Sequence, residues 1–132
     1  MIVVDTNILI HLQLETPDSP AAHALVEMDA NWYAPYLWRS EFRNTLVQYV
    51  RHQRLTLDEA RDASRSAEDL MYGHELFVDP NAVLELAIAS TCTAYDCEFV
   101  ALASELGIPL ITTDKQILRD FPRIARPLAD YR

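Results

Sequence analysis

The sequence predicts an α/β fold, an α/β/α sandwich around a central, mostly parallel sheet. Short runs of apolar and β-branched residues alternate along the chain with longer segments whose apolar residues recur at helical spacing. Residues that cap helices stand at several of the boundaries. Strands that alternate with helices are typical of a parallel sheet with helices packed on its faces.

The first half of the chain contains two predicted strands and three predicted helices. Residues 1–4 form an apolar strand that ends at Asp5, and residues 7–14 are long enough to begin a helix. Pro17 and Pro20 are expected to break this element before a second helix over residues 21–28 and a short strand over residues 32–34. A third helix over residues 38–54 follows from four apolar residues at helical spacing, Phe42, Leu46, Val47 and Val50. Glu41 therefore lies in the first turns of a helix.

The second half repeats the alternation with clearer boundaries. Thr56 and Glu59 fit a capping box, which predicts a helix to about residue 72 that ends at Gly73. A strand is expected over residues 75–78, and Asp79-Pro80 then starts a helix to about residue 90. Asp96 is expected to begin the next helix, which ends at Gly107. The remaining elements are a buried strand over residues 109–112, a short helix over residues 115–121 and an edge strand over residues 126–132.

Composition is that of one globular domain. The chain has 132 residues, and 50% of them are hydrophobic, enough for a core without disulfides or a structural metal. We find no linker-like stretch or internal repeat, so a single domain over residues 1–132 is expected. Asp5 interrupts the first apolar run before it could form a signal peptide or span a membrane, which favours a cytoplasmic protein. Cys92 and Cys97 lack the spacing of a zinc or redox site and are expected to be free thiols.

The charge balance bears on nucleic-acid binding. With 11 Lys and Arg against 20 Asp and Glu, the net charge of −9 argues against a broad basic binding face. That objection weakens if several of the acids are concentrated in a pocket that binds cations. Two short segments are locally basic, and they could be solvated helix faces or phosphate contacts. Their members are Arg39, Arg43, Arg51 and Arg54 in the first and Lys115, Arg119, Arg123 and Arg126 in the second.

Four acids stand where a site would form in such a fold. Asp5 and Asp114 directly follow predicted strands, while Glu41 and Asp96 lie near predicted helix starts. In parallel α/β sheets, sites form beyond the carboxyl ends of the strands. Each acid also has a structural explanation: Asp96 as a helix cap, Asp114 as a turn residue, and Glu41 as a surface acid paired with an arginine. Asp5 is harder to explain in this way, because burying a carboxylate without a cation or several donors is costly.

Carboxylates that converge in one crevice repel each other unless a cation compensates them. Mg²⁺ or Mn²⁺ suits such an oxygen-rich site, and the scattered histidines and cysteines disfavour zinc. A metal held in this way can orient a water, lower its pKa and neutralise charge on a phosphate. The acids therefore point to phosphodiester hydrolysis.

Four segments together resemble the acidic motifs of PIN-domain ribonucleases, and the likeness to bacterial and archaeal toxins of the VapC type is close. The resemblance spans almost the whole chain, and the segments occur in the family's order: residues 3–10 (VVDTNILI), 39–46 (RSEFRNTL), 95–103 (YDCEFVALA) and 110–118 (LITTDKQIL). It implies a PIN-like α/β/α sandwich. Cys97 departs from the family's pattern, which more often has a small apolar residue after the third acid, and a small thiol should be tolerated there.

The resemblance also implies an activity and a set of site residues. It implies a metal-dependent endoribonuclease with Asp5, Glu41, Asp96 and Asp114 as catalytic acids. Asp5 and Asp96 would be the principal ligands of Mg²⁺ or Mn²⁺, with Glu41 and Asp114 completing the cluster directly or through water. Asn7 and Thr112 resemble the family's supporting polar residues, while Thr6 and Thr113 stay open.

The resemblance further implies partners: an RNA substrate such as tRNA, a homodimer, and a VapB-type antitoxin, which would make the protein the toxin of a type II toxin–antitoxin pair. Other functions remain to be weighed. A phosphatase of the haloacid dehalogenase type would need an acid where Asn7 stands, and a receiver domain would need an acid pair where Asp5 stands alone. A non-catalytic PIN-like binding module and an RNA-processing PIN nuclease without an antitoxin are the nearer alternatives.

Overall fold

The computed structural model describes residues 1–131 and contains a five-stranded, all-parallel sheet in the order β3-β2-β1-β4-β5. Helices cover both faces of the sheet, so the predicted α/β/α sandwich is confirmed. The elements are β1 (Ile2–Val4), α1 (Thr6–Gln13), α2 (Ser19–Met28), β2 (Trp32–Pro35), α3 (Trp38–Arg51), α4 (Leu57–Met71), β3 (Glu75–Leu76), α5 (Pro80–Ile88), α6 (Ala94–Leu106), β4 (Leu110–Thr112), α7 (Lys115–Asp120), β5 (Ala125–Pro127) and a 3₁₀ turn η1 (Leu128–Tyr131).

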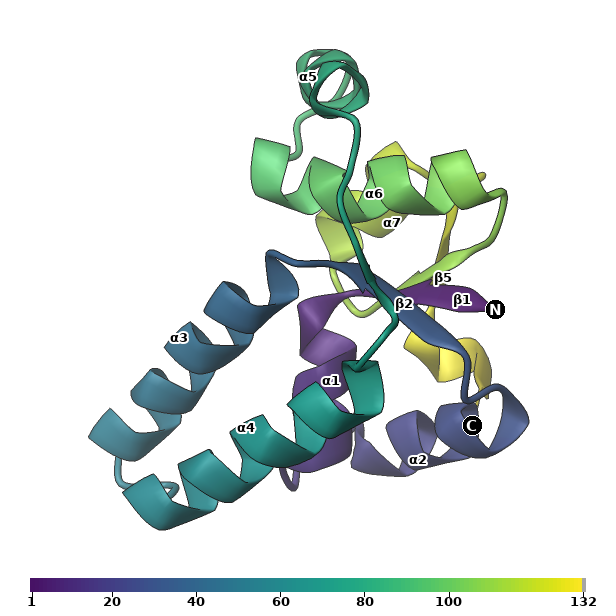
Figure 1. Ribbon diagram of the computed structural model, residues 1–132. Helices are drawn as coiled ribbons and strands as arrows, with labels where there is room; N and C mark the ends of the chain where they lie inside the picture. Colours follow the sequence, from purple (N-terminus) through teal and green to yellow (C-terminus); the bar gives the residue numbers. More distant parts are fainter. Residues whose placement is uncertain (132) are drawn as a thin grey trace.

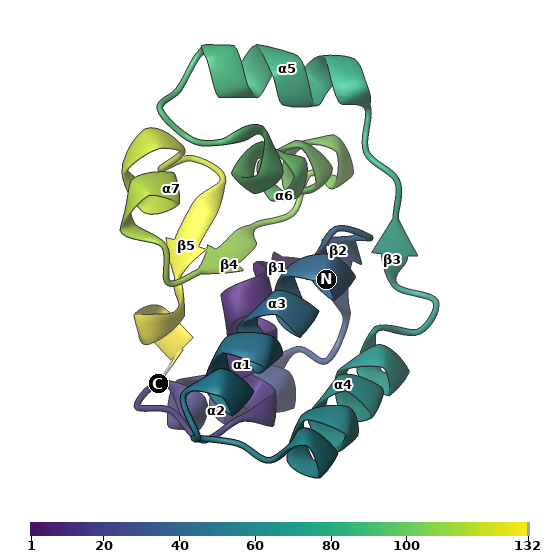
Figure 2. The same ribbon diagram turned by 90° about the vertical axis from the view of Figure 1, so that its left-hand side faces the viewer.

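The sheet is centred on β1. Its Ile2 pairs with Trp32 of β2 on one side, and its Val3 pairs with Leu110 of β4 on the other. All three residues of β1 are buried, as expected for a strand with neighbours on both sides and helices on both faces. Because the strands are parallel, the carboxyl ends of β1, β2 and β4 lie at the same edge of the sheet. Figure 2 shows the strands between the two helical layers.

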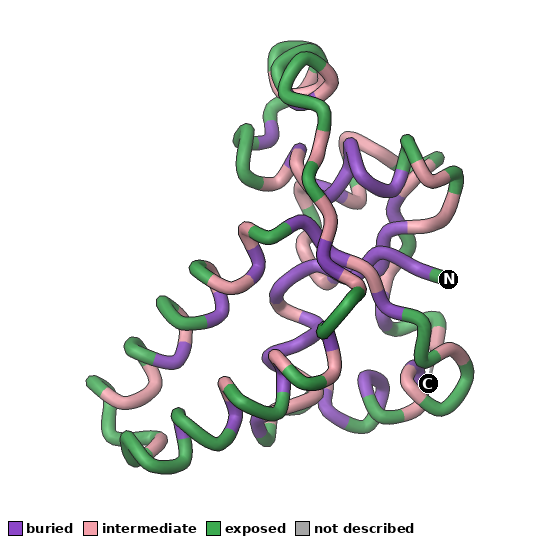
Figure 3. Tube along the Cα trace, viewed as in Figure 1, coloured by how far each residue is buried: buried purple, intermediate pink, exposed green. Residues whose placement is uncertain are grey.

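The two layers differ in depth. Figure 1 shows α5, α6 and α7 on one side of the sheet and α1 to α4 on the other. Helix α6 packs on the sheet and is covered in turn by α5, which explains why it is apolar on most of its faces. Its residues Phe99, Val100 and Leu102 are at most 1% exposed. In Figure 3 the buried positions accordingly concentrate along β1 and on the sheet-facing sides of the helices.

Several predicted boundaries differ from the structure. Helix α2 begins at Ser19, because Pro20 fits the first turn of a helix, where its missing N–H has no partner to lose. Helix α3 ends at Arg51, before Gln53 adopts a left-handed φ of 59°. Strand β3 covers only two residues of the four predicted. The predicted edge strand over residues 126–132 is instead β5, which starts earlier and leads into η1, while Arg132 lies outside the described residues.

The start of α6 also differs from the prediction. Thr93, and not Asp96, is its N-cap: the Thr93 hydroxyl accepts from the N–H of Asp96 at 3.1 Å, and the Asp96 carboxylate accepts from the N–H of Thr93 at 3.4 Å. Asp96 is therefore the third residue of the helix and one partner of a capping box. Within residues 1–131, no helix is long and apolar enough to cross a membrane.

Candidate active site

A chain of hydrogen bonds connects three of the four predicted acids at the carboxyl edge of the sheet. The Thr6 hydroxyl donates to the Glu41 carboxylate at 2.7 Å, and the N–H of the same residue donates to Asp5 at 2.8 Å. The Thr112 hydroxyl donates to Asp5 at 2.7 Å and accepts from the N–H of Asp114 at 2.9 Å. The structure thus brings Asp5, Glu41 and Asp114 together through the two threonines.

Asp5 occupies the centre of this arrangement because it directly follows the central strand β1. It is 7% exposed, and it caps α1 by accepting the N–H of Thr6. One carboxylate oxygen receives the hydroxyl of Thr112 and also the side-chain amide of Asn7, at 3.3 Å. Burial raises the pKa of Asp5 to about 7, although the hydrogen bonds from Thr112 and Thr6 oppose the shift and the charges of Glu41 and Asp96 add to it.

Glu41 enters the site from the first turn of α3. A buried acid at the end of the sheet holds that turn: Glu75 of β3 accepts from the indole N–H of Trp38 at 2.9 Å and pairs with Arg39 at 2.5 Å. Burial raises the pKa of Glu41, and the charges of Asp96 and Glu98 raise it further, against the hydrogen bond from Thr6. Arg39, which the sequence suggested as part of a basic segment, forms an ion pair with Glu75 within the protein.

Asp96 approaches from the first turn of α6. The charge of its carboxylate contributes to the raised pKa of both Asp5 and Glu41, as expected for an acid near both groups. Its bond to the N–H of Thr93, at 3.4 Å, is long, while the corresponding bond in the Thr56–Glu59 capping box of α4 measures 2.9 Å. A loosely held carboxylate of this kind is available to a ligand as well as to the cap.

Asp114 lies between β4 and α7 and is the N-cap of α7. Its carboxylate caps α7 by accepting from the N–H groups of Gln116 at 2.8 Å and Ile117 at 3.2 Å. The turn-residue explanation of Asp114 is therefore partly correct. Its second carboxylate oxygen makes neither of these two bonds, so it remains available to a ligand.

Glu98 is a further acid near the site that sequence reasoning missed. It stands two residues after Asp96 in α6, and burial raises its pKa. It also lines a cavity of about 430 Å³ together with the apolar side chains of Tyr36 after β2, Phe77 before α5 and Leu84 within α5. No motif singles out this position, and its charge influences Glu41 because α3 and α6 both begin at the carboxyl edge of the sheet.

The donor set of the crevice is suited to a hard divalent cation. It consists of carboxylate, hydroxyl and amide oxygens, and burial raises the pKa values of Asp5 and Glu41, with a smaller contribution from neighbouring acids. Within residues 1–131, the buried Oδ1 of Asn7 is a side-chain oxygen without a hydrogen-bond partner. No group of three or more His, Cys, Asp or Glu side chains in this part of the chain is arranged to hold an ion directly. A cation that keeps several waters, as Mg²⁺ does, fits such a spacing.

The sequence matches a known protein family over most of its length. The PIN domain family matches residues 2–126, which include all four acids and every strand except the last residue of β5. The chain is a PIN domain. The matched residues also include the four segments whose resemblance to this family the sequence shows.

Individual relatives agree with this membership. The ribonuclease VapC3 of Pyrobaculum aerophilum is 26% identical over 129 residues, which cover 96% of this chain and 98% of the relative. The crystal structure of PAE2754, also from P. aerophilum, superposes with a TM-score of 0.74 at 22% identity and covers 98% of this chain and 91% of its own. FitAcB from Neisseria gonorrhoeae gives a TM-score of 0.75 at 16% identity, covering 98% and 99% of the two chains. At these identities the two structures establish the fold of this PIN domain.

Proposed function

We propose that this PIN domain, over residues 1–132, is a metal-dependent endoribonuclease that hydrolyses RNA phosphodiester bonds. The observation that carries the proposal is the buried carboxylate of Asp5, which accepts hydrogen bonds from the neutral groups of Thr6, Asn7 and Thr112 and whose pKa burial raises to about 7, so that a bound cation would compensate its charge. The similarity to a ribonuclease VapC3 supports RNA as the substrate. Structured RNA such as tRNA is the substrate class that we propose, and the cytoplasm is the proposed location.

Each acid has a distinct task in this proposal. Asp5 and Asp96 hold Mg²⁺ or Mn²⁺, and Glu41 and Asp114 complete the cluster directly or through water. The bound ion supplies Lewis-acid chemistry, by which it lowers the pKa of a water and neutralises charge on the phosphate. Thr112 and Asn7 fix the carboxylate of Asp5, and Thr6 fixes that of Glu41, so the ligands are oriented before an ion arrives.

The test is RNA cleavage by the purified protein with Mg²⁺ or Mn²⁺, with and without EDTA. Asp5→Asn and Asp96→Asn keep the size of each side chain but remove its charge, and each should reduce the cleavage rate roughly 100-fold or more, since even partners of metal ligands are worth 10–100-fold. EDTA should stop cleavage by the parent protein. Asp62→Asn, at an exposed position on α4, is the matched control and should cleave at the parent rate.

Two outcomes would contradict the proposal. Cleavage that survives EDTA, or that persists in Asp5→Asn after contaminating nucleases are excluded, would separate the activity from the acids. An inactive parent protein that still binds RNA would favour the alternative of a non-catalytic PIN-like binding module.

We further propose that the protein is the toxin of a type II pair and binds a VapB-type antitoxin. A groove between α3 and α4 supports this part of the proposal: it has a volume of about 400 Å³ and an apolar floor that includes Leu46, Val50 and Ala60. Arg43, Arg51 and Arg61 line the same groove. An amphipathic helix with acidic residues along its edges would match both features. Without such a partner, the protein would be an RNA-processing nuclease.

A homodimer is the proposed assembly. Residues Phe77, Leu84 and Ile88, on or just before α5, are 86%, 60% and 88% exposed. Large apolar side chains that are exposed close together on one surface mark an interaction site. Figure 3 shows α5 largely exposed at the outer side of the molecule, where a second copy could reach it.

A further inference from the structure

The loop between α5 and α6 is held by α7 through one residue, Thr91. The Asp120 carboxylate accepts from the Thr91 N–H at 2.8 Å and from the Thr91 hydroxyl at 2.6 Å. Arg119 donates to the same hydroxyl at 3.1 Å, and Gln116 donates to the Thr91 carbonyl at 2.6 Å and to its hydroxyl at 3.0 Å. Three side chains of a six-residue helix therefore converge on a single residue 25 to 29 positions earlier in the chain.

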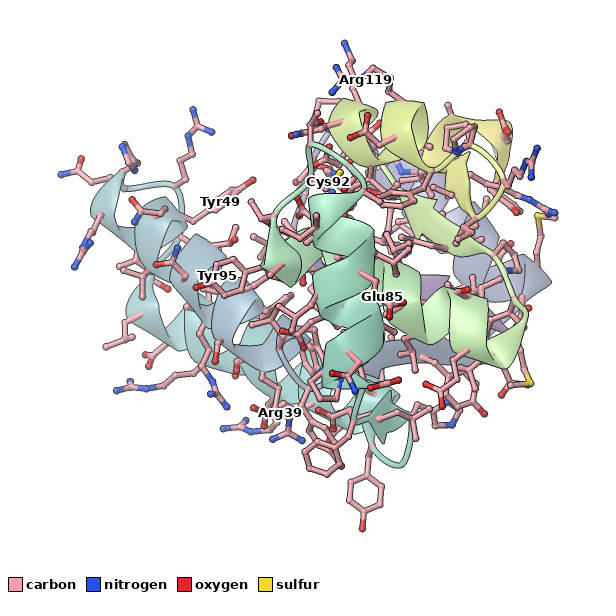
Figure 4. The ribbon with its side chains drawn as sticks, turned by 90° about the horizontal axis from the view of Figure 1, so that it is seen from above. Arg39, Tyr49, Glu85, Cys92, Tyr95 and Arg119 are labelled. Atoms are coloured by element: carbon pink, nitrogen blue, oxygen red, sulfur yellow. The ribbon has the colours of Figure 1, made fainter. Side chains whose placement is uncertain are left out.

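The buried thiol of Cys92 adds to this contact. The Cys92 thiol lies 3.7 Å from the Asp120 carboxylate, and burial raises its pKa to about 12, so the thiol remains protonated and can donate. Figure 4 shows Cys92 beside α7, with Arg119 extending outward from the same helix. Asp120 is itself only 13% exposed at its side chain, and the bonds from Thr91 lower its pKa to about 2. The carboxylate is therefore charged, and the contact intact, at any pH near neutrality.

Thr91 and Asp120, the two residues of this contact, each belong to a segment that also carries one of the four acids. Thr91 is two residues before Thr93, whose hydroxyl caps α6 and accepts the N–H of Asp96. Asp120 is the last residue of α7, whose first turn is capped by Asp114. The contact thus connects the helix start that carries Asp96 to the short helix that Asp114 caps. Within residues 1–131, Asp96 makes no hydrogen bond to the chain of bonds that joins Asp5, Glu41 and Asp114, so its alignment with them depends on how its helix start is held.

We propose that Asp120 is a positioning residue for the acidic site: by holding Thr91, it fixes the first turn of α6 so that the Asp96 carboxylate faces Asp5 and Glu41. This inference rests on the proposed metal-dependent nuclease activity for its functional consequence. Its structural content concerns the Thr93–Asp96 turn and is measurable without any activity. Asp120 itself caps no helix start and lies outside the four segments that resemble the acidic motifs of the family.

The experiment combines Asp120→Ala with two milder variants. Asp120→Asn keeps one oxygen that can accept from Thr91, and Thr91→Val removes the hydroxyl on which Asp120, Arg119 and Gln116 converge while it keeps the branched shape and the N–H. The matched control is Asp29→Ala. Asp29 also joins two segments, accepting from the N-terminal ammonium at 2.7 Å and from the N–H of Asn31 at 2.9 Å, at the opposite end of the strands.

Two quantities are measured at a temperature well below unfolding: amide hydrogen exchange at Asp96 and Cys97, and the Kd for Mn²⁺ by calorimetry without RNA. In Asp120→Ala we expect these amides to exchange about tenfold faster while core amides such as Val4 change less, as in local opening. The Kd for Mn²⁺ should rise about tenfold, the usual effect of losing a residue that orients a metal ligand. Asp120→Asn should recover part of both losses, and Asp29→Ala should show neither.

Unchanged exchange at Asp96 in Asp120→Ala and Thr91→Val would overturn the proposal, as would equal changes in Asp29→Ala, which would indicate a general loss of stability. Faster exchange with an unchanged Mn²⁺ affinity would also overturn it, because the held turn would then have no effect on the site. If the parent protein bound no Mn²⁺, the proposed nuclease would fail, and the exchange data would still decide whether Asp120 holds the turn of Asp96.

Discussion

At the scale of single residues, the central feature is a buried carboxylate with neighbours of the same charge. Asp5 is ringed by donors from Thr6, Asn7 and Thr112, yet its pKa is raised because burial outweighs these bonds. The pKa of Glu41 is also raised mainly by burial, and the charge of Asp96 contributes to the shift at both acids. Such a cluster lowers the stability of the metal-free protein in return for a strong attraction to cations.

This arrangement predicts how the stability of the metal-free protein changes with pH. The pKa of Asp5 is about 7 in the folded protein against an ordinary value of 3.8, so between these values the folded state holds a proton that the unfolded chain has lost. The free energy of unfolding should therefore fall as pH rises from about 4 to 7, by up to about 1.4 kcal/mol per pH unit, and level off above pH 7. The raised pKa values of Glu41 and Glu98 act in the same direction.

The measurement is urea unfolding in EDTA at several pH values from 5 to 8. Asp5→Asn should flatten most of the slope and be more stable than the parent at pH 8. The lowered pKa values of Asp29, Glu75 and Asp120 have the opposite sign, but their stabilisation is lost mainly at pH values below this window. A slope that Asp5→Asn leaves unchanged would show that Asp5 does not carry the extra proton.

At the scale of secondary-structure elements, the two capping boxes allow a direct comparison. Thr56 begins α4 with Glu59, and Thr93 begins α6 with Asp96, but only the second helix start carries an acid of the site. Thr56→Ala and Thr93→Ala should each cost about 1 kcal/mol in the free energy of unfolding, the usual worth of an N-cap. Only Thr93→Ala should also slow RNA cleavage, because it frees the backbone turn that aims Asp96.

Denaturant unfolding and cleavage assays on the two variants provide the check. Thr56→Ala serves as the control for stability alone, since Thr56 follows the C-terminal end of α3 whereas Glu41 lies in the first turn of that helix. Equal losses of activity in both variants would mean that destabilisation, and not the placement of Asp96, limits cleavage.

Elements that depend on local chemistry were the ones predictable from the sequence. The Thr56–Glu59 box, the start of α5 at Asp79-Pro80 and the left-handed Gly107 at the end of α6 follow from neighbouring residues. Thr93 was missed because Asp96, an equally good capping residue, lies three positions later in the same turn. Strand β3 was overextended, since nothing local indicates that only two of its residues find a partner strand.

The same distinction holds for the site. Asp5 and Asp114 were predictable because each follows a strand, and the parallel sheet brings strand ends together. The bond from Thr6 to Glu41 spans 35 residues and the contact of Asp120 with Thr91 spans 29, and no local pattern encodes either. Glu98 lies close enough to influence Glu41 only because α6 packs across β1 and β2.

At the scale of the whole molecule, the exposed apolar residues of the α5 region predict the assembly. The parent protein should be a dimer by light scattering after gel filtration. Leu84→Glu together with Ile88→Glu should weaken dimerisation by a factor of about 30 or more, because a central apolar contact in an interface is commonly worth about 2 kcal/mol. Leu57→Glu places the same charge on α4, at a side chain 56% exposed, and should leave the dimer intact. A parent protein that is monomeric at high micromolar concentration would contradict this interface.

The strand order β3-β2-β1-β4-β5 determines when each strand can find its neighbours during synthesis of the chain. Strand β1 obtains its first neighbour from β2, about 30 residues later, but its second only from β4, about 107 residues later. During synthesis, when a chain emerges from its N-terminus onward, residues 1–76 can pair as β1, β2 and β3 while one side of β1 still lacks its strand. Thr112 and Asp114 arrive with β4, so the nascent protein cannot assemble its acidic crevice until that last gap in the sheet is closed. A chain that is released early would therefore expose an unpaired central strand and carry an incomplete site.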